Sequence, residues 1–142
     1  MDKIVSGKNY KIQNVQSKTV IDLSQGDNET IFAWQFLNAA NQKWTLTSVG
    51  GNKWTIQSVA QSSKYLSYGD AAEGSHCKGT TTATQWFIVP DPNNKTHFRI
   101  YTDKSAFVVD VSEGKPDNGT VIFLWVERGH NYDNQLWEIV EA

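Results

Sequence analysis

The chain has 142 residues, of which 39% are hydrophobic, and its formal net charge at pH 7 is −2. This length and apolar content suffice for one domain with its own core, so we expect a single domain over residues 1–142. With 13 Lys and Arg against 15 Asp and Glu, the sequence has no basic patch of the kind that nucleic-acid binding requires.

The cysteine content and the first residues indicate the cellular compartment of the protein. Cys77 is the only cysteine, so no intrachain disulfide forms and folding needs no oxidising compartment. Residues 1–7 lack the apolar stretch of a signal peptide, and no run approaches the roughly 20 apolar residues of a membrane helix. We therefore expect a cytoplasmic, soluble protein without membrane insertion.

Short segments rich in Val, Ile, Thr and aromatic residues alternate with turn signals along the whole chain, without a helical period. This pattern is typical of an all-β protein. The predicted strands include residues 19–23, 44–48, 54–59, 86–89, 98–102, 107–111, 121–126 and 136–140.

The strands belong to a threefold internal repeat, with repeats at about 10–50, 54–90 and 98–142. A third of this size cannot bury its own apolar face, whereas three stacked thirds share one core. A closed, pseudo-threefold arrangement also removes exposed strand edges, which predicts a β-trefoil. The repeats begin at Tyr10, Trp54 and Phe98 and lead to three tryptophans that we assign to the core, Trp44, Trp86 and Trp137.

An aspartate occurs at the same mid-strand position in the first and third repeats, as Asp22 and Asp110. In the second repeat the alignment places Tyr65 there. An ionised carboxylate in an apolar strand costs desolvation free energy unless it is hydrogen-bonded, so its recurrence indicates a partner. A ligand hydroxyl is one candidate.

Two further features distinguish the same repeats from the middle one. Trp34 and Trp125 align with each other, whereas the middle repeat has Gly-Ser-His-Cys at residues 74–77. An Asn-Gln pair precedes the core tryptophan in the outer repeats, and the middle repeat has Ala-Thr at residues 83–84. The predicted binding residues are Asp22, Trp34, Asn41 and Gln42 in the first repeat and Asp110, Trp125, Asn134 and Gln135 in the third.

These residue types suit the recognition of a polyhydroxylated ring. A carboxylate and an amide take two neighbouring hydroxyls, and an indole face covers the apolar C–H side of the ring. We expect the glutamine to brace the aspartate. His76, His97 and His130 lack metal-ligand spacing, and no catalytic grouping occurs, so we expect no cofactor, no metal and no enzymatic activity.

The stretch at residues 118–125, followed by Asn134-Gln135-Leu136-Trp137, resembles the binding subdomain of the ricin B-chain-type lectins, whose QxW repeats fold as a β-trefoil. The resemblance covers nearly the whole chain. It implies recognition of galactose or N-acetylgalactosamine, with the aspartate on the 3- and 4-hydroxyls, the aromatic residue stacked beneath the sugar and the asparagine completing the grip. His130 would at best neighbour the sugar of the third repeat.

Because the residue set recurs in the first and third repeats, we expect two sites that cross-link glycans on glycoproteins or glycolipids, and a homodimer would add valency. Phe32 and Phe123 depart from the family, many members of which have a glutamine there. The cysteine-poor form without a signal peptide is similar to lectins of fungal fruiting bodies, which implies a role in defence. Two alternatives remain open: a β-trefoil protease inhibitor acting through an exposed loop, and a carbohydrate-binding module separated from a glycosidase.

Overall fold

The computed structural model describes residues 4–104, 106–129 and 131–142. The described residues form twelve β-strands and three short 3₁₀ helices, which confirms the all-β class. The 3₁₀ helices are Ala40–Gln42, Ser112–Gly114 and Asp133–Gln135. The strands are β1 (Lys8–Asn14), β2 (Val20–Leu23), β3 (Ile31–Trp34), β4 (Trp44–Gly50), β5 (Lys53–Ser58), β6 (Tyr65–Tyr68), β7 (Cys77–Thr80), β8 (Gln85–Asp91), β9 (Asn94–Tyr101), β10 (Val108–Val111), β11 (Thr120–Trp125) and β12 (Trp137–Glu141).

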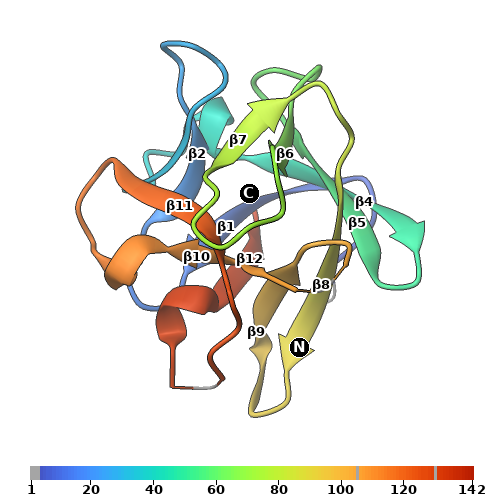
Figure 1. Cartoon of the computed structure of the whole chain (residues 1–142). Helices are drawn as coiled ribbons and strands as arrows, with labels where there is room; N and C mark the ends of the chain where they lie inside the picture. The colour runs from blue at the N-terminus through green and yellow to red at the C-terminus, as the bar shows by residue number, and fades with distance from the viewer. Residues whose placement is uncertain (1–3, 105, 130) are drawn as a thin grey trace.

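The first and fourth strands of each repeat close into a barrel. Antiparallel pairings lead from β1 to β4, β5, β8, β9 and β12, and then back from β12 to β1. The chain order of these strands can be followed by colour in Figure 1, from blue β1 to red β12. A closed ring leaves none of these six strands as an open edge.

The second and third strands of each repeat form a hairpin: β2 with β3, β6 with β7, and β10 with β11. These hairpins contact one another, because β3 pairs with β11 and single bridges join Thr30 to Lys78 and His76 to Phe123. A six-stranded barrel with three connected hairpins is the β-trefoil that the repeat pattern predicts.

The three repeated tryptophans lie in the core, as predicted. Each is fully buried, and each donates its indole Nε1–H to a backbone carbonyl of the hairpin in its own repeat, at 3.0 Å. The donor and acceptor pairs are Trp44 with Ile21, Trp86 with Leu66, and Trp137 with Val109.

The indole bonds correct the predicted alignment of the middle repeat. Leu66 accepts the bond that Ile21 accepts in the first repeat, so Ser67 corresponds to Asp22, and the assignment of Tyr65 is wrong. The turn after β5 is one residue longer than the turn after β1, which shifts the register. The strand pairing likewise places Lys78 opposite Ser67, so β7 at residues 77–80 replaces the predicted segment 74–77.

The break between the second and third repeats is tighter than predicted. Pro90 and Asp91 remain within β8, and β9 begins at Asn94. Asp91 is buried and accepts a 3.2 Å ion-pair contact from Arg99, which ties the two strands together. None of the helices in the described part of the chain is long and apolar enough to span a bilayer.

We predict that Trp44→Phe destabilises the protein by about 2 to 4 kcal/mol, because it leaves a cavity and removes the indole donor to the buried Ile21 carbonyl. Urea unfolding followed by circular dichroism measures this loss. The matched control is Trp54→Phe, since Trp54 is only half-buried, and its loss should be clearly smaller. Equal losses in the two variants would contradict a special role of the indole bond.

Candidate functional site

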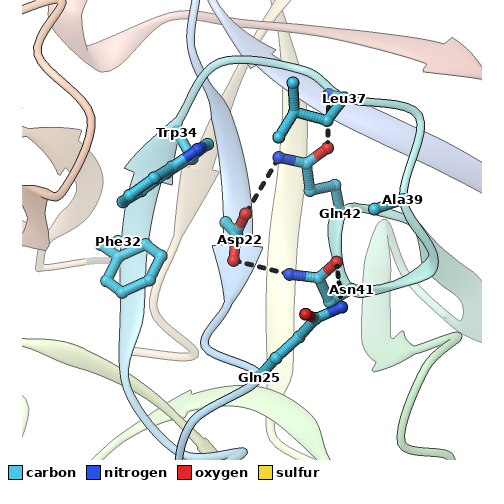
Figure 2. A pocket seen from close by; sticks show the side chains of 8 residues that line it. All are labelled: Asp22, Gln25, Phe32, Trp34, Leu37, Ala39, Asn41 and Gln42. Carbon is cyan, nitrogen blue, oxygen red and sulfur yellow. Dashed lines mark hydrogen bonds between the residues drawn. The ribbon is translucent and has the colours of Figure 1, made fainter.

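Asp22 lies in the middle of β2 and is 4% exposed. Its Oδ1 accepts a hydrogen bond from Asn41 Nδ2 at 2.9 Å, and its Oδ2 accepts one from Gln42 Nε2 at 2.9 Å (Figure 2). A carboxylate oxygen has two lone pairs. Each oxygen therefore keeps acceptor capacity for a ligand hydroxyl.

The glutamine is held from several sides. Gln42 Nε2 also donates to the Gln35 carbonyl at 2.8 Å, and Gln42 Oε1 accepts from the Leu37 backbone N–H at 2.8 Å. Both side-chain N–H groups and the carbonyl are thus engaged within the protein. Gln42 braces the aspartate and fixes the loop after β3.

The asparagine is also a brace. Asn41 Nδ2 donates to the Leu23 carbonyl at 3.1 Å in addition to Asp22, so both of its N–H groups are used. Gln25 Nε2 donates to Asn41 Oδ1 at 3.2 Å, which leaves this oxygen one further lone pair. Asn41 therefore presents an acceptor to a ligand while it orients the carboxylate.

An aromatic wall stands beside Asp22. The rings of Phe32 and Trp34 are half-buried, with centroids 5.3 Å apart, and lie on one side of the carboxylate, opposite the amides (Figure 2). The Asp22 carboxylate, the two amides and the two rings line a shallow, open hollow that has room for a sugar ring. Its lining residues are Asp22, Gln25, Phe32, Trp34, Leu37, Ala39, Asn41 and Gln42.

The third repeat builds the same arrangement. Asp110 is 3% exposed, and its two oxygens accept from Asn134 Nδ2 at 3.0 Å and Gln135 Nε2 at 2.9 Å. Gln135 is held as Gln42 is, by the Val126 carbonyl at 2.9 Å and the Arg128 backbone N–H at 2.9 Å. The sequence prediction that these residue types converge in two repeats agrees with this geometry.

The aromatic wall of the third repeat consists of Phe123 and Trp125, whose rings are stacked with centroids 5.1 Å apart. Asp110 pairs with Phe123 across the hairpin, so their side chains lie on the same face, and Trp125 follows two residues later on that face. This second hollow shares no lining residue with the first. Its lining residues are Asp110, Ser112, Glu113, Phe123, Trp125, Arg128 and Asn134.

The middle repeat carries different chemistry at these positions. The Ser67 hydroxyl is hydrogen-bonded to the Thr84 hydroxyl, so a neutral pair replaces the carboxylate and its glutamine. Lys78 and Thr80 stand where the other repeats have phenylalanine and tryptophan. Neither a carboxylate nor an aromatic wall is present there.

Burial makes both aspartates weaker acids. Desolvation raises the pKa of Asp22 above its ordinary value, although the hydrogen bonds from Gln42 and Asn41 oppose the shift. Desolvation raises the pKa of Asp110 to about 6 against the hydrogen bond from Gln135, the charge of Arg128 and the hydrogen bond from Asn134. Carboxylates kept in such surroundings are typical of functional sites.

The sequence did not single out several residues that line the hollows. Phe32 and Phe123 depart from the residue that is common in the family, yet their rings form part of the walls. Gln25 and Leu37 line the first hollow, and Glu113 and Arg128 line the second at the corresponding places. The residue types differ between the two repeats, so the sequence pattern does not reveal these positions. His130 lies outside the described residues, and the described residues contain no cluster of three or more metal-ligating groups.

Sequence comparison matches residues 3–78 and 40–125 to the model of a family described as ricin-type beta-trefoil lectin domain-like. A comparison with curated proteins by sequence gave no match.

Several solved structures resemble this fold. The ricin B-like lectin of Macrolepiota procera in complex with lactose is 32% identical, with a TM-score of 0.93 over 99% of this chain and 100% of that one. The Rhizoctonia solani agglutinin is 27% identical, with a TM-score of 0.84 and complete coverage of both chains. The designed threefold symmetric protein ThreeFoil, 18% identical with a TM-score of 0.85 over 94% of this chain and 99% of that one, shows the fold alone.

The raised pKa of Asp110 predicts how stability changes with pH. A carboxyl that binds its proton more tightly when folded adds stability that is fully present below its unfolded pKa of 3.8 and is lost as pH rises through about 6. We expect the free energy of unfolding to fall by about 1 to 2 kcal/mol more between pH 4 and pH 7 in the natural protein than in Asp110→Asn, because the folded protein must give up the proton of a buried carboxyl. Denaturant unfolding across this range measures the difference, and parallel curves would contradict the prediction.

Proposed function

Because the chain belongs to the ricin-type β-trefoil lectin family, we propose that it binds galactose- or N-acetylgalactosamine-bearing glycans reversibly through one site in the first repeat and one in the third. One observation carries the proposal: the same cluster of a buried aspartate, two bracing amides and an aromatic wall occurs in both repeats. Burial of the carboxylate works against its ionisation, so a purely structural role would not favour it there.

The free acceptor positions define the mode of binding. The remaining lone pairs of Asp22, or of Asp110, accept from two neighbouring ring hydroxyls, and Trp34, or Trp125, covers the C–H face of the ring. Galactose suits this arrangement because its hydroxyls and its apolar face lie on different sides. The lactose complex of the similar Macrolepiota procera lectin supports the choice of a β-galactoside.

Two shallow sites give weak single contacts but strong multivalent ones. One site of this kind binds with a Kd of about 1 mM, or roughly −4 kcal/mol. On a surface covered with glycans the second contact becomes intramolecular, and avidity rises by about 10²- to 10⁴-fold where the spacing fits. The protein would then cross-link glycoproteins or glycolipids without catalysis, and a homodimer would add binding sites. Such cross-linking would serve a fungus in defence against animals that feed on it.

Each aspartate should control its own site. We predict that Asp22→Ala abolishes lactose binding at the first site only, that Asp110→Ala abolishes it at the third site only, and that the double variant stays folded but binds no lactose. NMR titration with lactose separates the sites, because the indole signals of Trp34 and Trp125 report them individually.

The control for these variants is Asp70→Ala, which removes an exposed carboxylate outside both hollows and should leave both titrations unchanged. Lactose binding by a folded double variant would refute the assignment of the sites. If neither lactose nor N-acetylgalactosamine perturbs the indole signals of the natural protein, the proposed function itself is wrong, and protease inhibition through a loop is the next activity to assay.

Binding at the third site should depend on pH. Protonation of Asp110 removes acceptor capacity, so lactose affinity at this site should fall several-fold from pH 7.5 to pH 5, across its pKa of about 6. The Trp125 indole signal, titrated with lactose at both pH values, measures the change. Constant affinity over this range would contradict the requirement for an ionised Asp110.

A further inference from the structure

The two hollows are alike in their centres and differ at their rims. Leu37 and Arg128 occupy corresponding places, because the backbone N–H of each donates to the bracing glutamine, at 2.8 and 2.9 Å. Gln25 and Glu113 also correspond, since each comes three residues after the aspartate of its site. A neutral pair on the first rim is thus replaced by a charged pair on the third.

The rim of the first hollow adds no charge to Asp22. Leu37 is 59% exposed, although it is a large apolar side chain, and Gln25 is hydrogen-bonded to Asn41. Figure 2 shows Gln25 and Leu37 at opposite ends of the hollow, with Asp22 between them. The corresponding positions of the third site therefore place one charge at each end.

At one end of the third hollow, Glu113 lies 3.7 Å from Lys115 Nζ, and both side chains are largely exposed. At the other end, the Arg128 guanidinium carbon lies 5.4 Å from the ring centroid of Trp125 and 5.5 Å from that of Tyr132. The guanidinium therefore lies within cation–π distance of both rings, beside the wall that the sugar would contact.

Arg128 is available to a ligand. It is exposed, and among the described residues no carboxylate forms an ion pair with it. The adjacent Glu127 is engaged elsewhere, since its Oε2 accepts from the Gly129 backbone N–H at 2.6 Å and its Oε1 accepts from the Tyr101 hydroxyl at 3.4 Å. The guanidinium fork therefore keeps free donors at the rim.

We infer that the third site prefers galactosides that carry an anionic group, a sulfate ester or a carboxylate, next to the bound ring, whereas the first site prefers neutral galactosides. The inference rests on the proposed function, because the galactose ring must occupy the hollow for its substituent to reach Arg128. A guanidinium binds sulfate or carboxylate with two parallel charge-assisted hydrogen bonds. Leu37, in the corresponding place, offers only an apolar contact, so an anion there loses hydration without gaining a partner.

Proteins with one working site test the preference. Asp22→Ala leaves the third site and Asp110→Ala leaves the first, and each is titrated with lactose, with lactose sulfated on galactose O3 or O6, and with sialyllactose linked through the same positions. We expect at least one anionic probe to bind the third site about tenfold more tightly than lactose, the factor that about 1.4 kcal/mol represents, and to lose this advantage at high salt. The first site should favour none of them.

A reciprocal exchange identifies the cause. In the protein with only the third site, Arg128→Leu should abolish the preference for anions relative to lactose; these titrations are made at about pH 8, because loss of the Arg128 charge raises the pKa of Asp110 further. In the protein with only the first site, Leu37→Arg should create the preference. Both positions are exposed, so folding should be unaffected. Lys8→Gln is the control, because it removes an exposed cation outside both hollows and should leave the preference unchanged.

The outcomes separate this inference from the proposed function. If lactose binds both sites but no anionic probe is preferred at the third, or if the preference survives Arg128→Leu, the inference is wrong and the two-site lectin stands. If lactose binds neither site, the proposed function fails and the inference with it. A preference for the sulfated or the sialylated probes alone supports the inference and identifies the anion.

Discussion

The hydrogen bond from a buried indole N–H to a strand carbonyl is the contact on which each site is built. In the first repeat Trp44 donates to the carbonyl of Ile21, the residue just before Asp22. The turn that carries Asn41 and Gln42 directly precedes this tryptophan, so fixing the indole against the strand brings both amides to the carboxylate. The core thereby determines the geometry of the site, because a shift of the indole would separate the amides from the aspartate.

The middle repeat shows that the core and the site are separable. Trp86 keeps the indole bond to Leu66 at the same 3.0 Å, while Ser67 and Thr84 replace the carboxylate and glutamine with two neutral hydroxyls. The neutral pair satisfies itself without desolvating a charge, and the fold stays symmetric. Since the trefoil forms without the aspartate in one repeat, the buried carboxylates of the other two are not a requirement of the fold, which is consistent with a role in binding.

Residue types that recur at repeat spacing made most of this structure predictable. The core tryptophans and the residues grouped around Asp22 and Asp110 could be found in the sequence because the same types return in corresponding places. The middle repeat was misaligned because one extra residue in a turn shifts the strand register without changing composition. The rim positions could not be found, because Leu37 and Arg128 correspond only through a backbone bond to the glutamine side chain, which leaves no trace in residue type.

Each aromatic wall is completed by a neighbouring repeat. Gly119 of the third repeat donates its backbone N–H to the Ala33 carbonyl at 2.8 Å, and a Cβ added there would lie 3.9 Å from the Trp34 ring. Gly74 of the second repeat bonds to Leu124 at 2.7 Å and lies similarly close to Trp125. Both glycines have a φ near +90°, which side chains disfavour. The middle repeat therefore supports the tryptophan of the third site, although its own hairpin lacks the aspartate and the aromatic wall. A side chain in place of Gly74 would strain the backbone beside Trp125, so the third site depends on the repeat that has no such site of its own.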